Sequence, residues 1–169
     1  MAVIGADAVE GLLDILVDPA NTPMQTGLAS WGLSFVGARA PEALREAARS
    51  PNARIRTAAI GALGDQIQNL GDEAARQLLT DALNDDDEEV RAEANTVMGK
   101  LNDSEWALPL LLPKLDDDSS LVRKNAALSL MKLEDPAAIQ ALENRFTKEN
   151  DPGVKPILRL AVNQLEQHT

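Results

Sequence analysis

The side chains of this sequence that could do chemistry are mainly carboxylates, and they form two clusters. Residues 85–89 read Asp-Asp-Asp-Glu-Glu, and residues 116–118 read Asp-Asp-Asp. Such groups could bind a divalent cation or a basic partner, but neither cluster has the spacing of a calcium loop. Carboxylates are also favoured where a turn opens a helix, because the helix dipole is positive there. We therefore interpret both clusters as solvated turns and predict no metal site.

Other reactive groups are scarce. The sequence has no cysteine, which excludes a disulfide, a thiol nucleophile and a cysteine-based metal site. Its single histidine, His168, stands beside the C-terminus, where a catalytic triad could hardly recruit it. The glycines do not have the spacing of a phosphate-binding loop. We predict no catalytic, cofactor-binding or metal-binding residue, no cofactor, and a protein that is not an enzyme.

Composition sets further limits. The 169 residues suffice for one domain, and 44% of them are apolar, mostly the helix formers Ala and Leu, while only 2% are aromatic. A formal charge of −11 argues against nucleic acid as the main partner. No apolar run is long enough to span a membrane, and the start lacks the pattern of a signal peptide. These features predict a cytoplasmic protein without a membrane span.

An internal repeat runs through the chain. Segments beginning at an apolar residue recur at steps of 31, 35, 32 and 32 residues. Positions 0, +4 and +8 of each segment are mainly apolar or small, which is one face of an α-helix. They read Met24/Leu28/Gly32, Ile55/Ala59/Leu63, Val90/Ala94/Met98, Val122/Ala126/Leu130 and Val154/Leu158/Val162. The pattern predicts that each segment is a helix with this face in the core.

Capping residues recur in phase with the apolar face. Three residues before each start stands a residue type that caps helix N-termini: Asn21, Asn52, Asp87, Ser119 and Asp151. We expect these second helices at 22–37, 53–69, 88–101, 120–133 and 153–167. An amphipathic segment precedes each one, which predicts first helices at 7–17, 41–49, 72–84, 104–115 and 136–147. Pro109 and Pro113 should distort the fourth of these, and Gly71 should end helix 53–69.

Stacked hairpins of this kind predict an all-α fold, because a hairpin cannot bury its apolar face alone. We expect a single domain over residues 1–169, a right-handed α-solenoid of about five two-helix repeats. The approximate repeat boundaries are 6–37, 40–70, 72–101, 104–133 and 135–167.

The repeat resembles the HEAT-like repeat family first recognised in phycobilin lyase subunits. The motif D-x-x-V-R-x-x-A-x-x-x-L appears as Asp87, Val90, Arg91, Ala94 and Met98. The resemblance implies an armadillo-like α-solenoid but says little about function, since many unrelated scaffolds share the motif. The metal-dependent proteins of this type use His-Glu pairs, which this sequence lacks. By the same resemblance, residues 1–5 look like the end of a preceding second helix followed by a turn, which suggests a longer solenoid or a truncated first repeat.

A column of basic residues follows the apolar start of the repeats. Arg56, Arg91 and Arg123 occupy it, with Gln25 and Lys155 at the equivalent positions. We interpret these arginines as a structural ladder that pairs with the acidic caps of adjacent repeats. Binding of an anionic partner is the alternative.

The outward face of the second helices is the predicted binding surface, because these helices line the concave side of a HEAT solenoid. Leu128 and Leu160 stand where polar residues are expected, with Met131, Lys124 and Lys132 beside them. We predict that this patch binds a partner protein. A register error of one residue, or cover by the C-terminal segment, would remove it. Trp31 is expected to fill the space left by Gly27 and Gly32 rather than to stack on a ligand.

The leading functional hypothesis is a non-catalytic scaffold or adaptor that binds a protein partner on the concave face. By resemblance, the partner would be a phycobiliprotein or a maturation factor. One alternative is a subunit of a phycobilin lyase or another phycobilisome-related factor, in which a cysteine of the substrate protein attacks the chromophore. The other is a structural segment of a longer solenoid. The sequence identifies neither the partner, nor a bound bilin, nor the oligomeric state.

Overall fold

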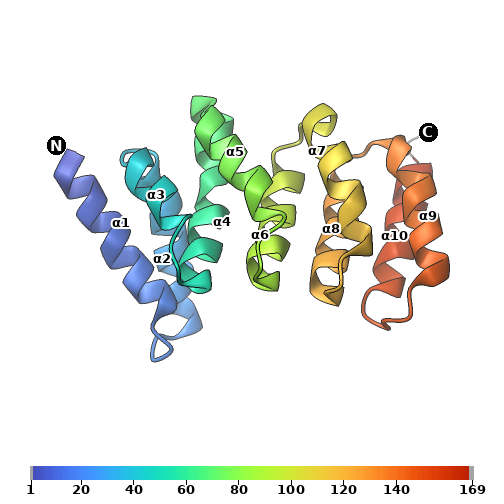
Figure 1. Ribbon diagram of the computed structural model, residues 1–169, viewed down its shortest axis with the longest axis horizontal. Helices are drawn as coiled ribbons and strands as arrows, with labels where there is room; N and C mark the ends of the chain where they lie inside the picture. Colours follow the sequence, from blue (N-terminus) through green and yellow to red (C-terminus); the bar gives the residue numbers. More distant parts are fainter. Residues whose placement is uncertain (1, 168–169) are drawn as a thin grey trace. The chain divides into compact units, whose positions relative to one another are not determined.

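The computed structural model describes the backbone of residues 2–167 and the side chains of residues 5–167, so His168 and Met1 lie outside it. Every regular element in this part of the chain is a helix (Figure 1). No helix among the described residues is long and apolar enough to cross a membrane. Two compact parts make up the chain, which we call the N-terminal unit (residues 1–82) and the C-terminal unit (residues 83–169).

The N-terminal unit contains five helices in its described part: α1 (Ala2–Val17), α2 (Pro23–Gly37), α3 (Pro41–Ala47), α4 (Ala53–Leu70) and α5 (Glu73–Ala82). Helix α4 packs against α2, α3 and α5, and α1 packs along α2. The apolar side chains between these helices are fully buried, among them Leu33, Leu44 and Leu63.

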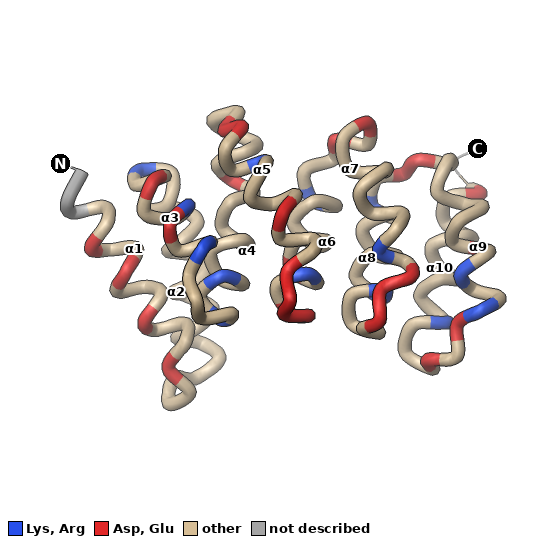
Figure 2. The backbone as a smooth tube through the Cα atoms, in the orientation of Figure 1, with Lys and Arg blue, Asp and Glu red and all other residues tan. Residues whose placement is uncertain are grey.

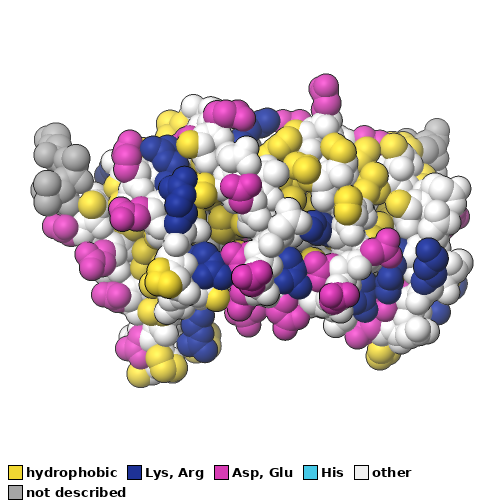
Figure 3. All heavy atoms as spheres, in the orientation of Figure 1, with side chains coloured by type: hydrophobic (Ala, Val, Ile, Leu, Met, Phe, Trp, Pro, Cys, Tyr) yellow, Lys and Arg dark blue, Asp and Glu magenta, His cyan; other side chains and the backbone are white. Residues whose placement is uncertain are grey.

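The C-terminal unit repeats the hairpin arrangement. Its described elements are α6 (Glu88–Lys100), α7 (Ser104–Leu111), the 3₁₀-helix η1 (Leu112–Asp116), α8 (Ser120–Lys132), the 3₁₀-helix η2 (Pro136–Ala138), α9 (Ile139–Lys148) and α10 (Lys155–Glu166). Helix α8 packs between α6 and α10, and α10 also packs on α9. The space-filling view shows hydrophobic side chains gathered over α7 (Figure 3).

The sequence predicts these helices well, with ends that agree to within two residues outside α1 when the 3₁₀ turns are included. The predicted distortion of the fourth first helix is confirmed, because α7 contains Pro109 and passes into η1 just before Pro113. The predicted turn after residue 5 is wrong, since α1 is one continuous helix from Ala2. Gly5 lies within this helix, where its lack of a side chain leaves room for the segment around Ala40. A Cβ at Gly5 would lie 3.1 Å from the Cβ of Ala40.

Helix ends follow the predicted capping chemistry at α4 and α6 but not at the other three predicted caps. The Ser119 side chain makes no capping hydrogen bond to α8. Asp151 accepts hydrogen bonds from the N–H groups of Gly153 and Val154, in the turn just before α10, and is not the N-cap of that helix. The side chains of Asn52 and Asp87 accept hydrogen bonds from the first turns of α4 and α6, and Gly71 ends α4 with φ of 61°. Asn21 does not cap α2. Thr22 does so instead, in a capping box with Gln25, because Pro23 occupies the first helical position and so fixes where the helix starts.

The predicted core face is confirmed in α6 and α8 but wrong in α2. The three predicted core residues of α6 and the three of α8 are all buried. In α2, Met24 and Leu28 are exposed, and Ala29, Leu33 and Gly37 are buried instead. The first copy of the repeat is therefore shifted by one residue relative to the register that the period suggested.

An arginine–carboxylate ladder links the loops of the C-terminal unit. The Nε and NH2 atoms of Arg91 each lie 2.9 Å from a carboxylate oxygen of Asp117, and its NH1 donates to the backbone carbonyl of Asp85 at 2.9 Å. Arg123 repeats this geometry with Glu149, at 2.8 and 3.0 Å, and with the carbonyl of Asp117 at 2.9 Å. Each guanidinium thus joins the loop before its own helix to the loop before the next second helix.

The acid in each rung is not the helix cap that the sequence suggested but a residue two positions before it. In the N-terminal unit, Arg56 makes the equivalent backbone contacts, with NH1 at 2.9 Å from the carbonyl oxygen of Ser50 and 3.3 Å from that of Pro51. These arginines therefore hold loop backbone in place, which is a structural task.

Candidate functional site

Helix α2 carries a row of large apolar side chains on its outer face. Met24, Leu28, Trp31 and Phe35, which we call the α2 stripe, are 76%, 64%, 73% and 56% exposed. Their spacing places them in one line, opposite the buried face of the same helix. No residue of α2 is charged, whereas α1 beside it carries several acids (Figure 2). A helix that is apolar on both faces is normally covered on both, so the α2 stripe is a candidate binding surface.

Stacked rings give the α2 stripe its shape. The rings of Trp31 and Phe35 are 6.2 Å apart and inclined by 11°, and the Arg39 guanidinium lies 4.8 Å from the centre of the Phe35 ring. The Phe35 ring thus has two partners within the chain, Trp31 and Arg39, and the Trp31 ring is stacked on Phe35. The arrangement suits interdigitation with side chains of another helix better than stacking on a flat ligand.

The predicted packing role of Trp31 is wrong. The side chain is 73% exposed, because the one-residue shift in α2 turns it away from the core. A Cβ at Gly32 would lie 3.3 Å from Leu12, so α1 fills the space there, and a Cβ at Gly27 would meet nothing within 4 Å. The sequence signal for this surface was the charge-free run from Pro23 to Gly37, in which apolar residues fall on two opposite faces.

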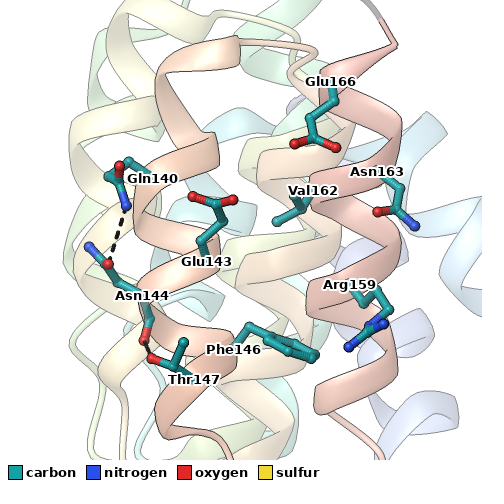
Figure 4. Close-up of a pocket in the computed structure, with 9 residues that line it drawn as sticks. All are labelled: Gln140, Glu143, Asn144, Phe146, Thr147, Arg159, Val162, Asn163 and Glu166. Atoms are coloured by element: carbon teal, nitrogen blue, oxygen red, sulfur yellow. Dashed lines mark hydrogen bonds between the residues drawn. The ribbon is translucent and has the colours of Figure 1, made fainter.

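A groove of about 510 Å³ lies between α9 and α10 (Figure 4). Its wall on α9 carries Gln140, Glu143, Asn144, Phe146 and Thr147, and its wall on α10 carries Arg159, Val162, Asn163 and Glu166. The Phe146 ring extends from α9 towards α10 at one end of the groove (Figure 4). The groove could not be predicted from the sequence, because no single repeat column marks it.

Two cations lie close to the Phe146 ring: Arg159 lines the groove, and Lys155 lines an adjoining pocket that shares Phe146 and Arg159 with it. The Arg159 guanidinium lies 4.7 Å and the Lys155 ammonium 5.2 Å from the ring centre. Lys155 also donates to the carbonyl oxygen of Glu149 at 3.1 Å. Basic side chains are visible over α8 to α10 in the space-filling view (Figure 3). This end of the groove can receive a carboxylate group, while Glu143 and Glu166 repel one further along.

The residues of the predicted partner patch are placed unevenly. Leu160 is 49% exposed, and Lys124 and Lys132 are also exposed. Leu128 and Met131 are half-buried in α8. Leu160 directly follows Arg159 on α10, so the exposed part of the patch adjoins the groove in sequence. Binding of a partner there stays a prediction.

The acidic clusters have structural partners. Asp87 caps α6. Partial burial raises the pKa of the Asp117 carboxyl, but hydrogen bonds from the Arg91 side chain and the backbone N–H of Ser119 outweigh this effect, so the pKa of Asp117 is lowered. Within the part of the chain that the structure describes, no group of three or more His, Cys, Asp or Glu residues is arranged to hold a metal ion.

Comparison with known proteins identifies the class. The family model for HEAT repeats matches residues 9–98 and 77–162, so the chain belongs to the HEAT-repeat family. Over 161 residues it is 42% identical to the bilin biosynthesis protein MpeU of Synechococcus sp. (strain WH8020). This match covers 95% of the chain but 54% of MpeU, so the chain spans about half the length of this curated relative. The resemblance to phycobilin lyase-type HEAT repeats is confirmed.

Solved structures confirm the predicted all-α solenoid fold. A chain from the complex of CpcE and CpcF of phycocyanin lyase from Nostoc sp. PCC7120 superposes with a TM-score of 0.73 and 22% identity, over 92% of this chain and 98% of that one. A designed armadillo repeat protein in complex with the peptide (KR)4 gives a TM-score of 0.59 at 23% identity, over 96% and 84% of the two chains. At these identities the likenesses concern the fold.

The prediction that the chain is not an enzyme is contradicted. The finding that overturns it is the 42% identity to a bilin biosynthesis protein over 95% of the chain. The absence of Cys excludes only a thiol nucleophile of this chain, and a protein can serve a reaction by binding and orienting reactants without supplying a nucleophile.

Proposed function

We propose that this chain is a subunit of phycobilin lyase type, which holds a bilin while a cysteine of a substrate protein becomes joined to it. The observation that carries the proposal is the 42% identity to a bilin biosynthesis protein over 95% of the chain. Binding a protein partner, the role expected from the sequence, becomes part of this function rather than the whole of it.

The chemistry asks little of the subunit's own side chains. The thiol adds across an exocyclic carbon–carbon double bond of the bilin: a sulfur–carbon bond forms, and the thiol proton ends on the tetrapyrrole. No leaving group or oxidant is required. Because the 169 residues include no cysteine, they form no thioether themselves. The contribution of this chain is to bind and orient the reactants, which alone can account for a large share of a rate enhancement.

The groove between α9 and α10 is the proposed contact site for the bilin. Its volume, about 510 Å³, falls within the range usual for small-molecule sites. A bilin is an apolar conjugated chain with two propionate groups, and Arg159 and Lys155 stand 4.7 and 5.2 Å from the Phe146 ring centre, where they can pair with such carboxylates. Repulsion by Glu143 and Glu166 then favours the orientation with the propionates at the Phe146 end.

The α2 stripe is the proposed contact surface for a protein partner. Its aromatic and aliphatic side chains are exposed in one line along the helix, as in surfaces that bind another helix. The exposed residues around Leu160 form a second candidate surface on the C-terminal unit.

Titration of the protein with a purified free phycobilin tests this function. We expect the visible absorbance of the bilin to shift on binding to the wild type. The double variant Lys155→Gln/Arg159→Gln should bind about tenfold or more weakly, because each lost charge-assisted hydrogen bond contributes on the order of 1 kcal/mol. Lys100→Gln, which removes an exposed charge on α6 of the same unit, is the control.

The outcomes separate two claims. If the wild-type protein leaves the bilin spectrum unchanged, alone and with a bilin-free phycobiliprotein present, the proposed function is wrong. If it binds the bilin and the double variant binds equally well, the function stands and the groove is not its site.

A further inference from the structure

We infer that the α2 stripe is the contact surface between two copies of this chain, with α2 of one copy packed antiparallel on α2 of the other. The inference rests on the proposed function only in taking the stripe as a protein-binding surface, and it goes further by identifying the occupant. The four side chains of the α2 stripe are 56% to 76% exposed, and α2 has no charged residue. Such an apolar surface is expected to be covered by a binding partner.

The stripe is complementary to itself. Consider a two-fold axis that runs midway between the two α2 helices, perpendicular to both and level with the point between residues 29 and 30. Met24 of one copy then faces Phe35 of the other, and Leu28 faces Trp31, since both pairs of residue numbers are centred on that point. Each aliphatic side chain meets an aromatic one, and each contact occurs twice, as an isologous interface requires. In the parallel arrangement, Trp31 would meet Trp31 and leave gaps beside Leu28.

Charge favours the same occupant. Two copies of a chain with a net charge of −11 repel each other, so a self-contact must fall where no acid is placed against another. Helix α2 meets this condition. At its end, Arg39 of one copy comes to the region of residue 20 of the other, near Asp18, and both side chains are exposed. The arrangement therefore adds an opposite-charge pair at each end of the contact.

Size and shape are also adequate. The four side chains expose on the order of 500 Å² in one copy, compared with about 800 Å² per partner in a standard interface. Gly27, on the flank of the stripe, has open space beyond its missing Cβ and lets the helices approach closely. The flanking residues supply the remaining area, so we expect a reversible dimer with a dissociation constant in the micromolar range.

A single introduced cysteine tests the pairing, since the natural chain has none. In Gly27→Cys, the two sulfur-bearing positions lie about 8 Å apart along the helix axes, from the rise of about 1.5 Å per residue. A short bismaleimide can bridge them. Gly11→Cys is a matched control, because Gly11 is also a helical, exposed glycine whose Cβ would meet nothing within 4 Å. We expect at least tenfold more covalent dimer from Gly27→Cys than from Gly11→Cys at equal micromolar concentrations.

Sedimentation equilibrium of the unmodified protein provides the second measurement. The wild type should double in mass with rising concentration, and Trp31→Glu, shown by circular dichroism to be folded, should stay monomeric. A monomeric wild type at 100 µM (about the upper end of the expected range), with equal cross-linking of the two cysteine variants, overturns the inference and leaves the stripe to a different protein. The bilin titration tests the groove of the C-terminal unit, whereas cross-linking and sedimentation test α2 of the N-terminal unit. The proposed function and the proposed dimer can therefore fail independently of each other.

Discussion

Replacing Glu149 by glutamine is expected to lower the free energy of unfolding by about 3 kcal/mol, because the substitution removes a buried charge that pairs with two arginines, Arg123 and Arg145. The carboxylate is 1% exposed. It accepts hydrogen bonds from Arg123 Nε at 2.8 Å, from Arg145 NH2 at 3.1 Å and from the backbone N–H of Asp151 at 2.9 Å. Glutamine keeps the size of the side chain but leaves the guanidinium groups facing a neutral amide. Chemical denaturation at neutral pH measures the difference.

The pH dependence gives an independent check of the same contact. The hydrogen bonds from Arg123, opposed by desolvation but supported by the backbone N–H of Asp151 and by Arg145, lower the pKa of Glu149 to about 2. A lowered pKa in the folded state means that the carboxylate stabilises the fold fully above its unfolded pKa of about 4.3. That contribution is lost as the pH falls from about 5 to 2. The difference in stability between wild type and Glu149→Gln should therefore shrink over this range.

Asp116→Asn is the matched control, because Asp116 also pairs with Arg145, at 3.1 Å, but is 72% exposed. Solvent screens this pair, so its loss should cost less than about 1 kcal/mol. Equal losses for the two variants would show that burial does not set the strength of the Glu149 contact. A wild-type advantage that persists unchanged at pH 2 would show that the charge of Glu149 is not its source.

The helices of this fold could be predicted from the sequence because two independent patterns repeat in phase. The apolar face recurs through the chain, and capping residues such as Asn52 and Asp87 stand at a constant distance before it. Both are local properties of a helix, so their spacing reports where helices begin and which face they bury. Where the period slips by one residue, as in α2, that reasoning places Met24 and Leu28 on the wrong face.

The candidate binding surfaces were less accessible to sequence reasoning, because each depends on contacts between elements. Phe146 comes from α9, and Lys155 and Arg159 from α10, so the groove exists only once the hairpin has closed. The rungs of the ladder could have been found. Asp117 and Glu149 both stand five residues before the apolar start of a second helix, in the same column as Ser50 and Asp85. The caps, two positions later in the sequence, offer a local explanation for the acids and so hide this column.

Substitution of Gly99 by alanine is expected to destabilise the C-terminal unit by about 3 kcal/mol. Gly99 is buried on α6, and a Cβ there would lie 2.6 Å from the Cβ and 2.7 Å from the Cα of Ser129 on α8. The obstacle includes backbone, so a change of side-chain rotamer cannot relieve it. The Ser129 hydroxyl also donates to the carbonyl oxygen of Asn95 at 2.7 Å, and separating the helices would break this buried hydrogen bond.

Gly11→Ala makes the same chemical change without the obstacle and should have the opposite effect. Gly11 is exposed on α1 and has nothing within 4 Å of its ideal Cβ position. Alanine there should stabilise the protein by about 0.5–1 kcal/mol, since it restricts the unfolded chain and has the higher helix propensity. Thermal and chemical unfolding of the two variants measure both effects. A Gly99→Ala variant as stable as the wild type would mean that α6 and α8 can separate by about an ångström without loss, and that their close contact does not determine how these repeats stack.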